Sequence, residues 1–137
     1  MALSSLLLNE RLADITATDY HPQVSHFLDR NTELNRGKSI AFEQVDWAND
    51  TSQLGRFDLI IGSDLLYEDE HVLLLASFIH NHANQHCDVI LVDPDRGRKN
   101  KLDREMMAYG FTSDYIKPEH TDYLSEKYKG SILRFSR

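Results

Sequence analysis

Short apolar segments rich in β-branched residues alternate along this chain with longer segments whose apolar residues follow helical spacing. Strands are predicted at Ile15–Thr18, Ser39–Val45, Phe57–Gly62, Asp88–Val92, Phe111–Ile116 and Ser131–Phe135. Helices are predicted over residues 22–34, 68–81 and 101–109, and Gly37 is expected to cap the first of them. Such an alternation is typical of an α/β fold in which helices cover both faces of a doubly wound, mostly parallel sheet.

Polar residues follow each of the first four strands. They are Asp19-Tyr20, Asp46-Trp47, Ser63-Asp64 and Asp93. The carboxyl ends of parallel strands meet at one edge of the sheet, and ligands bind there in open α/β folds. Any single aspartate at such a position is also explained as a helix cap or turn residue. The series of four predicts a ligand site along this edge.

The composition limits the classes of protein to consider. The 137 residues suit one domain, taken as residues 1–137. Fifteen basic against 22 acidic residues give a net charge of −7, so a nucleic-acid partner is not expected. The longest apolar runs are far shorter than the roughly 18 residues of a membrane span, so no membrane partner is expected either. The lone Cys87 forms no intramolecular disulfide, which favours a cytoplasmic location.

Three histidines close together, His80, His82 and His86, are the nearest approach to a metal motif. No cysteine or carboxylate at a suitable spacing accompanies them, so no metal site is predicted.

Several motifs occur in the order found in a known family. Residues 16–22 and 31–35 resemble the second strand and following helix of class I, S-adenosylmethionine-dependent methyltransferases, and Val45-Asp46-Trp47 resembles the end of their third strand. Residues 57–67 resemble the fourth strand of the seven-β-strand lysine methyltransferases, including their Asp-x-x-Tyr signature at Asp64 and Tyr67. The resemblance extends from Leu3 to Phe135 and implies a Rossmann-like fold.

The chain departs from this family at its beginning. Residues 1–8 resemble the helix that follows the family's first strand and Gly-rich turn, and neither of those precedes them. We therefore expect an N-terminally truncated fold, from an internal start codon or a shortened gene product. The sheet would contain a gap, or the strand at Ile15–Thr18 would pair elsewhere. Weak or absent S-adenosylmethionine binding and self-association into a homo-oligomer are further expectations.

The resemblance implies cofactor-binding roles for Asp19, Tyr20, Asp46, Trp47 and Ser63. A carboxylate at Asp19 accepts both ribose hydroxyls of an adenosine, as in dinucleotide-binding folds; alternatively it caps the next helix. Asp46 and Trp47 correspond to the pair that contacts adenine, although the single tryptophan is equally explained as a packing residue.

The resemblance also implies that Asp64 and Tyr67 are the catalytic residues. Methyl transfer to an amine requires a neutral lone pair, and a free lysine has a pKa near 10.4. Asp64 would orient the amine, and Tyr67 would add an aromatic wall or a hydrogen bond. The alternative is that residues 64–70 form an acidic helix start that complements the helix dipole.

The basic loop over residues 93–101 is open to two interpretations: contact with an acidic substrate or phosphate, or a solvated face.

The predicted function is methyl transfer to a protein amine, with a protein substrate as partner. A truncated, non-catalytic module and a small-molecule N-methyltransferase are the alternatives. A receiver-like signalling domain fails because no acidic pair follows an opening strand.

Overall fold

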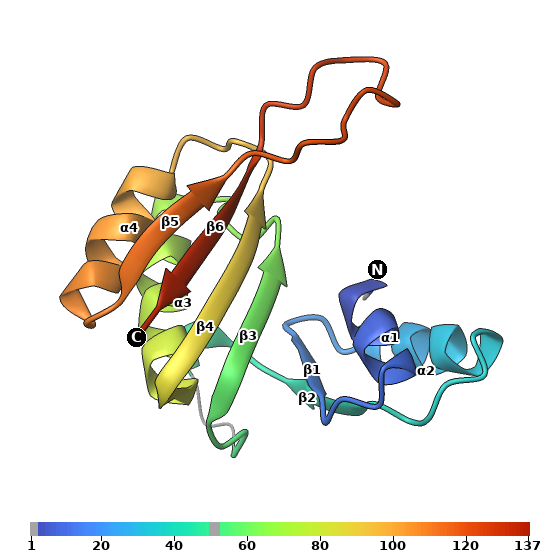
Figure 1. Cartoon of the computed structure of the whole chain (residues 1–137). Helices are drawn as coiled ribbons and strands as arrows, with labels where there is room; N and C mark the ends of the chain where they lie inside the picture. The colour runs from blue at the N-terminus through green and yellow to red at the C-terminus, as the bar shows by residue number, and fades with distance from the viewer. Residues whose placement is uncertain (1–2, 50–52) are drawn as a thin grey trace. The chain divides into compact units, whose positions relative to one another are not determined.

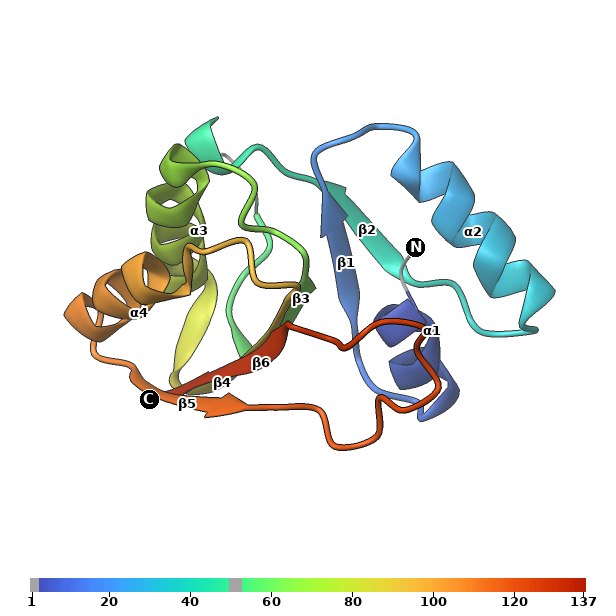
Figure 2. The same ribbon diagram turned by 90° about the horizontal axis from the view of Figure 1, so that it is seen from above.

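A computed structural model of the chain describes residues 3–49 and 53–137. It divides into two compact units, Met1–Leu54 and Gly55–Arg137, and each is described by itself. Figures 1 and 2 show their elements in two views. The prediction of a single domain over residues 1–137 stays a prediction.

The first unit contains a two-stranded parallel sheet and two α-helices. Its elements are α1 (Leu3–Glu10), β1 (Thr16–Asp19), α2 (Val24–Leu34), β2 (Ala41–Gln44) and a short 3-10 helix, η1 (Trp47–Asn49). The register pairs Thr16 with Ala41 and Asp19 with Gln44. Both strands therefore end at the same edge, as their predicted positions required.

The end of α2 differs from the prediction that Gly37 caps it. Arg36 adopts the left-handed conformation (φ 54°), and the amide of Gly37 donates to the carbonyl of Thr32 over 3.0 Å. This is the pattern of a Schellman turn, in which the left-handed residue precedes the one that closes the outer hydrogen bond. Gly37 is placed beside Thr32, where an added Cβ would lie 3.3 Å from Thr32 Cγ2.

The second unit contains a four-stranded sheet and two helices. Its elements are β3 (Phe57–Ser63), α3 (Asp69–His82), β4 (Ala83–Asp93), α4 (Lys99–Ala108), β5 (Thr112–Ile116) and β6 (Ser131–Ser136). The strand order is β3-β4-β6-β5, with β3 parallel to β4 and β6 antiparallel to both neighbours. The helices and strands confirm the Rossmann-like α/β fold class, with antiparallel pairing only around β6.

Both helices of the second unit lie on one face of its sheet (Figures 1 and 2). The core between them is made of fully buried side chains from every layer: Val72, Ile79, Val89, Leu102, Met106, Leu133 and Phe135. Alternate residues of β4 are buried, as expected for a strand with one face against helices. Cys87, predicted to precede this strand, lies within it and is buried.

The strands form two separate sheets. Among the described residues β1 pairs only with β2, and β3 pairs only with β4. The expected gap in one common sheet stays a prediction. Leu59 and Ile61 alternate along β3 on one face, and both are exposed. Within residues 3–49 and 53–137, no helix has the length and apolarity that crossing a bilayer requires.

Candidate functional site

The first predicted site residue, Asp19, ends β1 in the first unit. Its Oδ1 accepts a hydrogen bond from the amide of His21 over 2.9 Å, which closes a tight turn before α2. The helix begins later, at Val24, so Asp19 shapes the turn and does not cap the helix directly. The adjacent Tyr20 is largely exposed, and its carbonyl accepts from the Gln44 side chain over 2.9 Å.

Asp46 and Trp47 follow β2, next to the end of β1. The amide of Val45 donates to the carbonyl of Asp19 over 3.0 Å, which holds the two strand ends together. Asp46 accepts from the Ala48 amide (3.0 Å) and from the Asn49 side chain (3.1 Å), and so fixes the 3-10 turn that carries Trp47. The structure therefore brings Asp19, Tyr20, Asp46 and Trp47 to one edge of the first unit.

Asp64 and Tyr67 lie in the second unit, between the end of β3 at Ser63 and the start of α3. Asp64 is left-handed (φ 56°), and its amide donates to the carbonyl of Val92 over 2.8 Å. The Tyr67 hydroxyl donates to Asp64 Oδ2 over 3.3 Å. The helix begins at Asp69, and Asp69 and Glu70 supply the acidic first turn. Asp64 lies outside this helix, so the acidic helix start does not explain it.

Arg96, from the loop after β4, holds the Asp64 carboxylate in a two-point ion pair. Its Nε donates to Asp64 Oδ1 (2.5 Å) and its Nη2 donates to Oδ2 (2.8 Å). The same guanidinium carbon lies 4.3 Å from the centre of the Tyr67 ring, within the range of a cation–π contact. Asp64 and Tyr67 thus form a carboxylate and aromatic pair that already holds one cationic group.

The rest of this loop is also fixed. The Arg96 amide donates to Asp93 Oδ1 over 3.3 Å, and Asp93 is buried at the end of β4. Arg98 Nε lies 3.0 Å from Asp69 Oδ1, and Lys101 Nζ lies 3.5 Å from Asp69 Oδ2. These three basic residues therefore form ion pairs at a partly exposed surface, and neither interpretation of the basic loop is excluded.

The Arg96 hydrogen bonds lower the pKa of Asp64 below its ordinary value, aided by the charge of Arg96 and the Tyr67 hydroxyl and opposed by burial. A lowered pKa in the folded state stabilises the fold above the ordinary Asp value of about 3.9, and this contribution disappears as the pH falls through the folded-state value. We expect Asp64→Asn to be less stable than the wild type at pH 7 and equally stable well below pH 3. Denaturation in urea across this range checks it, and a difference that grows on acidification would contradict it.

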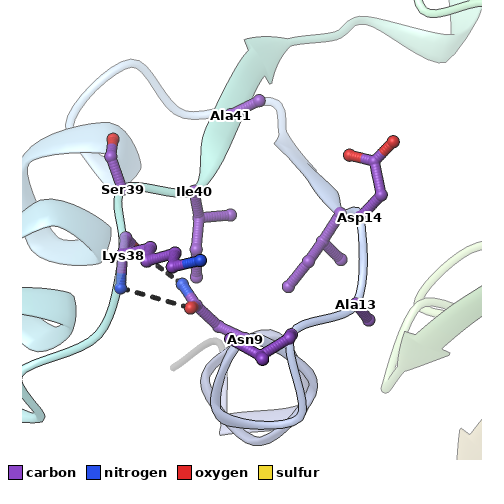
Figure 3. Close-up of a pocket in the computed structure, with 9 residues that line it drawn as sticks. Asn9, Ala13, Asp14, Lys38, Ser39, Ile40 and Ala41 are labelled. Carbon is purple, nitrogen blue, oxygen red and sulfur yellow. Dashed lines mark hydrogen bonds between the residues drawn. The ribbon is translucent and has the colours of Figure 1, made fainter.

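One open pocket of the first unit lies away from the predicted residues. Its volume is about 290 Å³, and its lining includes Asp14, Lys38 and Ala41 at the amino ends of β1 and β2 (Figure 3). Figure 3 also shows the Asn9 amide bonded to the Lys38 backbone, donating to its carbonyl over 2.5 Å. Because Asp19 and Asp46 lie at the carboxyl ends of these strands, this pocket is no part of the predicted site.

No three His, Cys, Asp or Glu side chains within the described ranges are arranged to hold a metal ion. His80 instead stacks on Tyr109, with ring centres 4.3 Å apart, and its Nδ1 lies 3.0 Å from Arg137 Nη1. Burial and the positive charges of Arg137 and Arg56 lower the pKa of His80. This histidine is a packing residue of the second unit.

Arg96 is the residue of this region that sequence reasoning missed. Its position two residues after the Pro94 turn places it at the same sheet edge as Asp64, since β3 and β4 are parallel neighbours. The chain carries a signal for this loop, namely four basic residues within eight positions of a strand-ending aspartate. The partner of each basic residue, however, depends on the left-handed turns at Asp95 (φ 76°) and Gly97 (φ 78°).

An open α/β fold with acidic residues at the carboxyl ends of its strands is typical of domains that bind nucleotides or related cofactors. The comparisons identify the family: residues 2–108 match the family model described as lysine methyltransferase. The chain belongs to this family and is an S-adenosylmethionine-dependent methyltransferase domain. No curated protein matches the chain.

Solved structures share the fold at low sequence identity. A methyltransferase from Pyrococcus furiosus is 19% identical, with a TM-score of 0.78 over 99% of this chain and 69% of that one. The ribosomal protein L11 methylase from Lactobacillus delbrueckii subsp. bulgaricus is 23% identical (TM-score 0.74; 99% and 66%). Magnesium protoporphyrin IX methyltransferase from Synechocystis, solved with bound S-adenosylmethionine, is 21% identical (0.72; 97% and 64%).

The first unit's residues fit the family cofactor in chemical type. Asp19 and Asp46 present carboxylates at adjacent strand ends, and the residues beside them, Tyr20 and Trp47, are aromatic. Carboxylates accept hydrogen bonds from ribose hydroxyls and from an exocyclic amine, and an indole offers an apolar face to a base. The assignment of Asp19, Tyr20, Asp46, Trp47 and Ser63 to the cofactor stays a prediction.

Proposed function

We propose that this domain transfers a methyl group to the side-chain amine of lysine in a protein substrate. The observation that carries the proposal is the Asp64–Tyr67 pair, which binds a cationic side chain through a carboxylate and an aromatic face. A lysine ammonium is a cation that such a pair also suits. The match to the lysine methyltransferase family supports the same acceptor.

The site must handle the proton of the amine. A lysine in water is almost fully protonated at neutral pH, and only its neutral form has a lone pair to react. Asp64 accepts a hydrogen bond from the amine and thereby aims the nitrogen, while the Tyr67 ring covers one side of the alkyl chain and excludes water. When bound, S-adenosylmethionine supplies an electrophilic methyl group; Asp19, Tyr20, Asp46, Trp47 and Ser63 are the residues proposed to hold it.

The proposal is tested with peptides and saturating S-adenosylmethionine that carries a labelled methyl group. A set of peptides presents lysine, acetyl-lysine, arginine or glutamine at one central position, and mass spectrometry locates the label. We expect label on lysine alone. Asp64→Asn should reduce the rate by about 100-fold, within the usual effect of a group that handles the reacting proton, and Tyr67→Phe by about tenfold. Glu70→Gln, which changes an exposed carboxylate in the first turn of α3, should retain the rate.

Each other outcome has a definite meaning. Label on small amines but on no peptide would overturn the protein substrate in favour of a small-molecule N-methyltransferase. Absence of label on every acceptor at saturating cofactor would favour the non-catalytic module. Equal rates for the wild type and Asp64→Asn would remove Asp64 from the catalytic residues.

A further inference from the structure

The guanidinium of Arg96 occupies the position at Asp64 and Tyr67 where an acceptor amine would have to bind. Both carboxylate oxygens accept from it, over 2.5 and 2.8 Å, and the Tyr67 ring lies 4.3 Å from its central carbon. These are the two contacts that a cationic amine has to make with the same pair. The chain therefore supplies its own competitor for this position.

The backbone of Arg96 is held independently of its side chain. Its amide donates to the buried Asp93, and its carbonyl accepts from Arg98 Nη1 over 3.1 Å. Arg98 in turn is anchored to Asp69 Oδ1 over 3.0 Å. Removal of the Arg96 side chain therefore opens Asp64 without removing the hydrogen bonds that hold the loop.

The Arg96 side chain is also free to leave. The side chains of Arg96 and Asp64 are 35% and 39% exposed, so water screens the ion pair in part and another cation can reach the carboxylate. The guanidinium reaches its partners through a long, rotatable side chain, and a small rotation carries it into solvent. Displacement by another cation is therefore energetically accessible.

From this geometry we propose that Arg96 is a specificity-determining residue that competes with the acceptor amine for Asp64 and must move aside before the amine binds. The proposal rests on the proposed function. While Arg96 is bound, the charge of Asp64 is compensated, so a free small cation gains little from binding there. An amine carried on a polypeptide has further contacts to offset the displacement of Arg96. Arg96 thus favours a polypeptide-borne amine over free amines.

The test measures cation binding without any cofactor. Amide resonances of Asp64 and Tyr67 are followed while n-butylammonium is added, and n-pentanol serves as the neutral probe of similar length. We expect Arg96→Gln to bind n-butylammonium about tenfold more tightly than the wild type, because an ion pair and a cation–π contact no longer oppose it. Lys99→Gln, which removes a neighbouring cation that lies 5.5 Å from the centre of the Tyr115 ring, should bind like the wild type.

Three further results decide the proposal. Arg96→Gln combined with Asp64→Asn should lose the gain, and n-pentanol should show no gain with any variant. Equal affinity in Arg96→Gln and the wild type, or an equal gain in Lys99→Gln, would overturn the proposal. If Arg96→Gln does not fold, Arg96→Lys is measured in the same way; it keeps the charge but loses the two-point contact, so a gain of severalfold is expected and no gain overturns the proposal.

The same experiment separates this inference from the proposed function. Tight n-butylammonium binding by Arg96→Gln together with no methylation of any peptide would support the cation site and count against the methyl transfer. Lysine methylation together with no effect of Arg96→Gln on binding would leave the proposed function intact and remove the role of Arg96.

Discussion

Replacement of Phe135 by alanine is expected to lower the free energy of unfolding of the second unit by about 3–5 kcal/mol, the usual range for a large aromatic side chain lost from a core. Phe135 is fully buried in β6, where it pairs in register with Val89 of β4 and Ser113 of β5. Because domains are stable by only about 5–15 kcal/mol, this single loss is a large part of the total. Urea denaturation followed by far-ultraviolet circular dichroism measures it.

The adjacent residue in the same strand provides the control. Arg134 points to the opposite face, where its Nη2 lies 2.9 Å from Asp88 Oδ2, and its side chain is 48% exposed. Arg134→Ala removes an exposed ion pair and should cost less than about 1 kcal/mol. A loss for Phe135→Ala no larger than that for Arg134→Ala would show that the face of β6 toward α3 and α4 is not the core of the unit.

The strands and helices were predictable because each carries a local signal. The helical spacing of Val72, Leu75 and Ile79 corresponds to burial in the structure, whereas the apolar run at Phe57–Gly62 forms β3 without a buried residue. The start of β4 is the exception, since the strand begins at Ala83 and the prediction began at Asp88. Residues 84–86 near its start are polar and are held by specific hydrogen bonds. For example, Asn84 Nδ2 donates to Asp58 Oδ1 over 2.7 Å. The spacing of apolar residues does not predict such bonds.

The predicted site residues were found only as far as they follow strands. Asp19 is the last residue of β1, Asp46 lies two residues after β2, and Asp64 directly follows β3, so the topology alone places them at strand ends. The contact of Arg96 with Asp64 joins residues 32 positions apart and depends on backbone turns at non-glycine residues. Left-handed conformations at Arg36, Asp64 and Asp95 are uncommon for such residues and carry no composition signal.

The division of the strands into two sheets was not predictable from the physical pattern. Periodicity identified the strands of the described residues, but it does not say which strands pair. These strands form the separate sheets β1-β2 and β3-β4-β6-β5. Sequence patterns establish elements, whereas strand pairing depends on contacts between residues that are far apart in the chain.

Gly130 is the last residue before β6, and it lies next to Asp93 at the end of β4. A Cβ added there would lie 2.5 Å from the carbonyl oxygen of Asp93 and would overlap the Tyr128 hydroxyl. Tyr128 can rotate away, but Asp93 is fixed by its pairing with Ser131 in the β4–β6 ladder. Where two backbones approach this closely, only glycine fits.

Gly130→Ala is therefore expected to destabilise the second unit by about 1–3 kcal/mol, the usual cost of overpacking. The same change at Gly62 provides the control, because a Cβ there meets the ends of two leucine side chains, Leu65 at 2.5 Å and Leu91 at 2.9 Å. Side-chain ends give way more readily than backbone, so Gly62→Ala should cost less. Since Asp93 accepts from the Arg96 amide, Gly130→Ala should also shift the Arg96 amide resonance. A cost for Gly62→Ala equal to or above that for Gly130→Ala would contradict the close backbone approach at Asp93.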